Sequence, residues 1–263
     1  MECKNCVSSF EDNLNYCSHC GAKVIRNRLT LKALFADFSQ QFLNYDNLFL
    51  KTFRHLTTKP EAVIGSYING TRKKYVNVIS YFAIALTLSG FQMFVLNKFF
   101  PELMNMDFMP NDGTKEIQQE NMSFVQEYQS IVFMLIVPVY AFISKIVFIN
   151  KKQFNYTEHL VINMYMTAHI SIISTILVLI VSLFGVNFGL FGLVSIPFQI
   201  LFSAYCFKRI FNLSFASIIL KTLLFLFLLT ALFIIIIIAT TVIMYLNGTL
   251  DEIREAQENL KKS

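Results

Sequence analysis

The sequence predicts an all-α integral membrane bundle of about five transmembrane helices behind a small cysteine-rich N-terminal module. Apolar side chains make up 55% of the 263 residues and charged ones only 15%, which is too apolar a balance for an ordinary soluble domain. Long apolar segments follow one another from Val76 onward. Four of the five cysteines, by contrast, lie in the polar part of the chain before residue 24.

The N-terminal cysteines form two C-x-x-C pairs, made of Cys3, Cys6, Cys17 and Cys20. Two such pairs can present four thiolates to one ion, and the gap between them suits a minimal two-hairpin zinc ribbon. The alternatives are two disulfides or a redox-active pair. A cytosolic segment disfavours disulfides, and two matched pairs do not fit a thioredoxin pattern. We therefore predict a structural Zn²⁺, without which so small a module would not fold.

Residues 30–58 have the periodicity of an amphipathic helix. Its apolar stripe consists of Leu31, Leu34, Phe35, Phe38, Phe42, Tyr45, Phe49, Phe53 and Leu56. One interpretation is a helix packed on the zinc ribbon or on a partner helix. We favour a cytosolic interfacial helix that inserts Phe35, Phe38 and Phe42 into the lipid, because the zinc ribbon is too small to cover so long a stripe.

A basic junction, Arg72-Lys73-Lys74, directly precedes the first apolar segment. Positive residues beside a membrane span stay in the cytosol, so the junction predicts a cytosolic N-terminus. It also places three cations near anionic lipid headgroups, which we expect them to contact. Gly70 can take the bend between the helix and the first span.

The order of motifs over about the first third of the chain resembles an uncharacterised bacterial membrane family, catalogued as domain of unknown function 3667. The matching positions are Cys3, Cys6, Cys17, Cys20, Gly21, Pro60, Tyr67, Ile68, Gly70, Arg72 and Tyr75. Val7 departs from it where a knuckle glycine is expected, and Val78 where the family often has a proline. The resemblance brings no known reaction with it. The five-span layout is also loosely similar to the Yip family of membrane-trafficking proteins, a similarity of layout that carries no function.

The predicted spans are 76–97, 131–148, 160–186, 188–207 and 221–246. If they alternate from a cytosolic N-terminus, the basic residues all fall on one side: Arg72, Lys73, Lys74, Lys145, Lys151, Lys152, Lys208, Arg209 and Lys221. The loop 98–128 is acidic and falls on the other side. We therefore predict a bacterial inner-membrane protein with a cytosolic N-terminus and a periplasmic C-terminus. The net charge of +5 is carried by residues 1–77, so we expect no nucleic-acid partner.

This reading divides the chain into four parts. They are a zinc ribbon (1–24), amphipathic interfacial helices with the basic junction (28–75), a five-span transmembrane bundle (76–248) and a charged C-terminal tail (249–263).

Polar side chains gather at the start of the third predicted span: Glu158, His159, Asn163, Tyr165 and His169. On a helix, Glu158, Tyr165 and His169 share one face, and His159 and Asn163 share a neighbouring one. Ionisable groups at membrane depth are costly and often functional, so this intramembrane polar site could bind a cation, relay protons or hold a lipid headgroup. Alternatively, Glu158 and His159 lie at the cytosolic interface and only His169 is buried, hydrogen-bonded to a neighbouring span.

The chain contains no G-x-S-x-G, G-x-x-x-x-G-K-[S/T] or G-x-G-x-x-G motif, so an enzyme is the least supported class. Our first hypothesis is a non-catalytic multi-pass membrane protein whose zinc ribbon and basic amphipathic helix recognise a lipid, a protein partner or a second copy. The alternative is a small transporter, channel or lipid-translocating protein that uses Glu158, His159 and His169.

Overall fold

The computed structural model describes residues 2–3, 5–9, 14–21, 24, 48–104 and 128–246. Phe35, Phe38 and Phe42, most of the acidic loop and the C-terminal tail lie outside these residues. The chain divides into two compact units, Met1–Asn47 and Leu48–Ser263. Each unit is treated by itself below.

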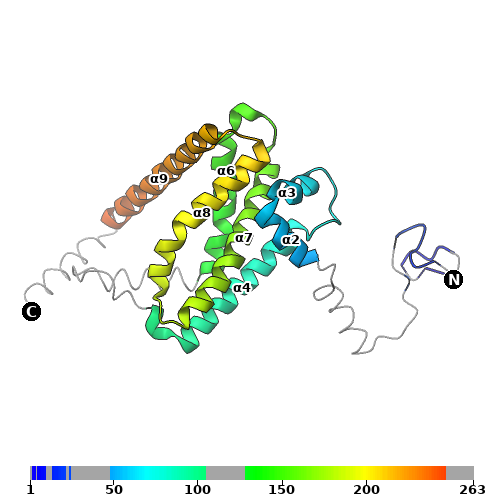
Figure 1. The fold of residues 1–263 in the computed structure, drawn as a ribbon, viewed down its shortest axis with the longest axis horizontal. Coiled ribbons are helices and arrows are strands. Elements are labelled where there is room, and N and C mark those ends of the chain that lie inside the picture. Colours follow the sequence, from blue (N-terminus) through cyan, green and yellow to red (C-terminus); the bar gives the residue numbers. More distant parts are fainter. Residues whose placement is uncertain are drawn as a thin grey trace, which may run out of the picture. The chain divides into compact units, whose positions relative to one another are not determined.

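The second unit is built from helices (Figure 1). In chain order they are α2 (Leu48–Thr58), α3 (Pro60–Ile68), α4 (Val78–Phe99), η1 (Pro101–Met104), α6 (Gln129–Val147), η2 (Ile149–Lys151), α7 (Tyr156–Ser182), α8 (Phe188–Phe211) and α9 (Phe215–Leu246). The helices α4, α7, α8 and α9 are long and apolar enough to cross a membrane, whereas α6 is apolar over the shorter stretch Ile131–Val147. The predicted all-α membrane bundle is confirmed, and each of the five predicted spans is a helix.

Asparagines begin three of these long helices. Asn77 accepts a hydrogen bond from Ser80 N at the start of α4, and Asn187 accepts from Gly189 N at the start of α8. Asn155 and Glu158 form a reciprocal capping box at the start of α7. Each side chain satisfies backbone N–H groups that have no partner inside the helix, so it fixes where the helix starts.

Helix α7 is the centre of the bundle, and it packs against α2, α3, α4, α6 and α8. Small side chains lie buried where it meets its neighbours, among them Ala85 and Ser89 of α4, Ala141 and Ser144 of α6, and Ala168 and Ser171 of α7. Lipid is as apolar as a leucine side chain, so burial alone does not drive helices together inside a membrane. Close packing at small residues and hydrogen bonds between helices, such as Ser89 to Ser171 at 2.8 Å, hold α4 and α7 together.

Helices α2 and α3 cover the first part of α7, where α4 does not reach. Tyr165, nine residues into α7, donates its hydroxyl to Val76 O just before α4 begins. About 14 Å of α7 therefore extends past the start of α4, given a rise of about 1.5 Å per residue. At the end of this extension Tyr67 of α3 lies 5.9 Å from the ring of Tyr165, and four residues further along α7 Phe53 of α2 lies 4.7 Å from the ring of His169.

This packing corrects the interfacial interpretation for the described end of the apolar stripe. Leu56 is buried in the bundle core, and Phe49 and Phe53 pack against that core. The physical reason is that α4 and α7 offer aromatic partners closer than the lipid, since Phe49 lies 5.8 Å from the ring of Tyr81 and Phe53 contacts His169. An ion pair fastens the same layer to α8, since Arg209 donates two hydrogen bonds to Glu61 at 2.6 and 3.1 Å. These bonds lower the pKa of Glu61.

Helix α9 is the most loosely packed span. Phe225, Leu228, Leu229 and Leu232 pack against the core, whereas the run Ile234–Ile238 is exposed. In Figure 1 the end of α9 that follows α8 lies beside the bundle, and its other end lies away from α8. In a membrane, lipid would cover this apolar face.

Candidate functional site

The four N-terminal cysteines come together around one point. Their ligand sulfurs all lie within 4.8 Å of one another, with Cys3 Sγ 3.6 Å from Cys20 Sγ and Cys6 Sγ 3.7 Å from Cys17 Sγ. A tetrahedral site with Zn–S bonds of about 2.3 Å places its sulfurs about 3.8 Å apart. A disulfide would need a separation of about 2.05 Å, and none of these four cysteines is in a disulfide. The cluster can therefore hold one metal ion.

The backbone turns of this cluster explain why glycine is expected after each pair. Val7 N donates to Cys3 O at 2.8 Å, and Gly21 N donates to Cys17 O at 2.9 Å. These turns place Val7 at a φ of 59° and Gly21 at a φ of 70°, both in the left-handed region. Glycine adopts this conformation freely, whereas a β-branched side chain is strained there. Val7, which stands where the family is expected to have glycine, is thus a strained residue beside the clustered cysteines.

The cluster also favours thiolate at one of its members. The backbone N–H of Cys20 and the hydroxyl of Ser8 hydrogen-bond the sulfur of Cys17 and lower its pKa to about 6. Thiolate is the form of cysteine that binds a metal, so these groups prepare the site for an ion.

His169 joins three helices in the interior of the bundle. Its Nδ1 lies 2.9 Å from the hydroxyl of Tyr81 on α4, and its Nε2 lies 3.0 Å from the hydroxyl of Thr57 on α2. The imidazole is fully buried, between the rings of Phe53 and Phe202 at 4.7 and 5.2 Å. Both ring nitrogens have partners, so His169 is a satisfied structural group in this arrangement.

His159 forms a second, separate polar group. Its Nδ1 lies 2.9 Å from the hydroxyl of Ser144 on α6, to which Asn163 Nδ2 also donates at 3.0 Å. Phe148, Phe154 and Phe211 surround the ring, with centroids 5.9 to 6.5 Å away. His159 is only 1% exposed, so it is buried as His169 is, which corrects the expectation that only His169 is buried.

The five predicted polar residues thus do not form one site. Glu158 is half-buried and belongs to the capping box with Asn155. Tyr165 is bonded to the backbone of Val76, while the two histidines lie in different groups. Helical spacing predicts which of these side chains share a face of α7. It does not predict which neighbouring helix packs against each face.

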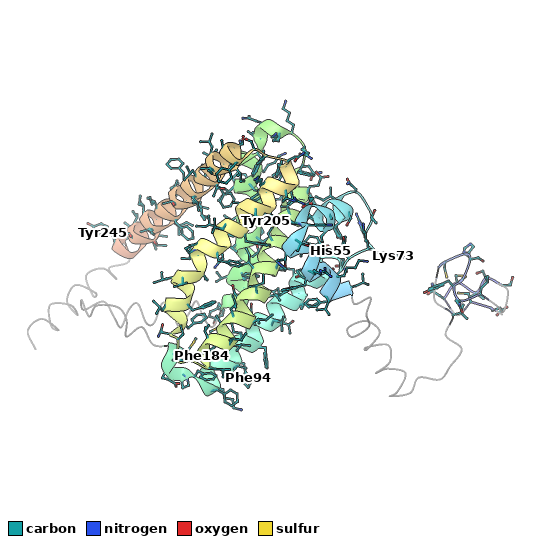
Figure 2. The ribbon with its side chains drawn as sticks, viewed as in Figure 1. His55, Lys73, Phe94, Phe184, Tyr205 and Tyr245 are labelled. Carbon is teal, nitrogen blue, oxygen red and sulfur yellow. The ribbon has the colours of Figure 1, made fainter. Side chains whose placement is uncertain are left out.

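The predicted lipid contacts of the basic junction remain a prediction. Arg72, Lys73 and Lys74 are all exposed in the turn between α3 and α4, where Gly70 has a φ of 87°. Arg72 lies 5.4 Å from the ring of Tyr67, and Lys74 lies 5.7 Å from that of Tyr75. Figure 2 shows Lys73 at this turn and Phe94 and Phe184 at the opposite end of the bundle.

A central cavity of about 500 Å³ lies among α4, α6, α7, α8 and α9. Polar side chains from four of these helices line it: Ser89, Gln92, Asn163, Thr167, Ser171, Ser174, Ser195, Gln199, Ser203, Lys221 and Thr222. The lining includes Asn163 but neither Glu158 nor His169. The sequence analysis missed this cavity, although Ser195, Gln199 and Ser203 recur every four residues along the fourth predicted span and so share one helix face.

Residues 46–90 match the family model described as Protein of unknown function (DUF3667). The predicted resemblance to this family is confirmed over these residues. The DUF3667 segment contains α2, α3 and the first half of α4, and with them Thr57, Tyr81 and the basic junction. It therefore covers the helices that pack on α7, and it leaves out the cysteine cluster. Neither the curated proteins nor the solved structures gave a match to this chain.

Replacing Val7 by glycine should tighten metal binding. The left-handed conformation costs a β-branched residue roughly 1–2 kcal/mol, and the greater chain entropy of glycine takes back roughly 0.5–1 kcal/mol. Because binding and folding are coupled in so small a module, we expect Val7→Gly to bind Zn²⁺ roughly fivefold more tightly, measured by competition with a chromophoric chelator. Val24→Gly is the matched control, since Val24 is outside the left-handed region, and it should bind no more tightly than the wild type. Equal affinities for Val7→Gly and Val24→Gly would contradict the strain.

The hydrogen bond between Tyr81 and His169 should give a measurable coupling energy in a double-mutant cycle. We expect Tyr81→Phe and His169→Leu to destabilise the bundle together by less than the sum of their separate effects, with a coupling of about 1 kcal/mol. Thermal unfolding in detergent, followed by circular dichroism, measures the four members of the cycle. Tyr245→Phe makes the same change at an exposed residue and should leave the unfolding temperature unaltered. Additive effects would show that the hydrogen bond contributes nothing.

Proposed function

We propose that this chain is a non-catalytic, multi-pass protein of the bacterial inner membrane whose N-terminal zinc module recognises a partner. The observation that carries the proposal is the set of four cysteine sulfurs within 4.8 Å. Four protein ligands fill a tetrahedral site and leave no position for a reactive water, which is the pattern of structural rather than catalytic zinc. A module of this size has almost no core of its own, so its role is to present a surface that the metal has shaped.

The orientation that we propose keeps the zinc module and the basic junction in the cytosol. Its support is the position of the basic residues on the second unit. The ends of α6 and α8 meet, since Phe148 and Phe211 stack at 4.2 Å, and Lys221 near the start of α9 donates to Val147 O. The basic residues of the α6–α7 and α8–α9 connections therefore gather toward one end of the bundle, where the inner leaflet would supply anionic headgroups.

The alternative function, transport through the polar residues of α7, receives less support in its original form. It requires a cavity that reaches Glu158 or His169, and neither residue lines the central cavity. Both histidines are hydrogen-bonded to neighbouring helices, and Glu158 caps α7.

The test is to measure zinc and bound partners in the same sample. The protein is crosslinked in cells, purified in mild detergent, and analysed for zinc content and for crosslinked proteins and lipids. We expect one zinc per chain and a defined partner set in the wild type. Cys17→Ser removes one ligand and should lose both, because a three-thiolate site binds zinc more weakly.

Cys206→Ala is the matched control, since Cys206 is buried alone in α8 and belongs to no ligand cluster in the described part of the chain. It should keep both the zinc and the partners. If Cys17→Ser lost its zinc and kept every partner, recognition by the module would be wrong. If the wild type carried no zinc, the metal itself would be wrong.

A further inference from the structure

The central cavity holds polar side chains that the bundle itself does not satisfy. Gln92 is only 4% exposed and lines the cavity, yet its amide makes no hydrogen bond within the described residues. Gln199 donates to Ser195 at 3.1 Å, and its carbonyl oxygen has no partner among those same residues. At membrane depth an unsatisfied polar group costs several kcal/mol, so a cavity lined this way calls for an occupant with polar groups of its own.

Lys221 gives the cavity its charge. It is the one formally charged residue of the lining, and no acidic side chain accompanies it there. Its ammonium donates to Val147 O and lies 5.7 Å from the ring of Phe148, which fixes it where α6 ends. A carbonyl oxygen does not neutralise a cation. The ammonium of Lys221 therefore favours an anionic ligand at this end of the cavity.

Apolar side chains of the lining continue toward the other end of the spans, beside the polar side chains of α4, α7 and α8. Along α7 the cavity runs from Asn163 to Val178, about 22 Å at about 1.5 Å per residue, which is the length of a long acyl chain. Phe188, Phe191 and Leu229 contribute apolar surface to the same wall. The volume of about 500 Å³ falls in the range of roughly 300–1,000 Å³ found for sites that enclose one small ligand.

The cavity is not closed off by protein at α8. Ile196 of α8 lines it and is 48% exposed. Helix α9 forms another part of the wall with its first half only, before the exposed run Ile234–Ile238. An occupant can therefore enter from the bilayer.

We propose that the central cavity binds one anionic amphiphile with a single acyl chain. Its carboxylate or phosphate monoester pairs with the ammonium of Lys221. Its chain lies along α7 and α8, and hydroxyl or ester groups near the head meet the polar side chains closest to Lys221, among them Asn163 and Thr222. This makes the bundle a lipid-binding element in its own right, independent of what the zinc module recognises.

The experiment uses the full chain in nanodiscs of phosphatidylcholine, with native mass spectrometry to count bound molecules. Three probes share an oleoyl chain: oleate, oleoyl lysophosphatidate and oleoyl lysophosphatidylcholine. We expect one molecule of oleate or of lysophosphatidate per chain, and at least tenfold weaker binding of the zwitterionic probe. The stronger of the two anionic probes identifies the headgroup as carboxylate or phosphate. If neither binds more tightly than lysophosphatidylcholine, the proposal fails.

Two variants test the site itself. Lys221→Met keeps the length of the side chain without its charge and should weaken the anionic probes at least tenfold, whereas Lys221→Arg should keep most of the binding. Gly192→Phe fills the cavity, since a Cβ at Gly192 meets no atom within 4 Å, and it should abolish binding.

Gly90→Phe is the matched control, because Gly90 has the same free space at its Cβ and is exposed on α4 outside the cavity. Unchanged anionic binding in both Lys221→Met and Gly192→Phe would overturn the proposal. So would an equal loss in Gly90→Phe, because the effect would then not depend on the cavity.

Discussion

The imidazole of His169 is the point on which the second unit is organised. It accepts or donates at both nitrogens, to Tyr81 on α4 and to Thr57 on α2, and so fixes two helices onto the middle of α7. In water such a hydrogen bond competes with solvent and contributes little. Inside a membrane the competing partner is absent, and a polar group without a hydrogen bond is costly. The position of α2 follows from this constraint, and with α2 in place the exposed length of α7 is covered.

The same constraint divides the interior of the bundle into two kinds of polar group. His159, Ser144 and Asn163 satisfy one another, as His169, Tyr81 and Thr57 do, and these groups determine which helices are neighbours. Gln92 and Gln199 are different, because their side-chain amides have hydrogen-bonding groups without a partner among the described residues. Both line the cavity. Groups that are satisfied hold the structure together, while unsatisfied groups around a cavity indicate what it binds.

His169 joins α7 to α2 and α4. The matched DUF3667 segment contains all of α2 and the first part of α4. It ends in the middle of α4 and includes the turn that carries the basic junction. In this chain the matched segment is thus a packing element, a pair of short helices and the first turns of a span, whose inner face is aromatic. The cysteine cluster forms a separate unit, whose own geometry is set by two tight turns and by the strain at Val7.

The sequence by itself determined the helical spans, the resemblance to the DUF3667 family and the grouping of the four cysteines, because each depends on local spacing: about twenty apolar residues cross a bilayer, and C-x-x-C pairs converge within one turn. Hydrophobic periodicity also identified the apolar face of α2 at Phe49, Phe53 and Leu56. It could not decide what covers that face, since lipid and protein are equally apolar partners. Only the tertiary structure decided that α7 covers it, that His159 and His169 belong to different groups, and that the polar faces of α7 and α8 enclose a cavity. These outcomes depend on how far one helix extends past another, which no local pattern records.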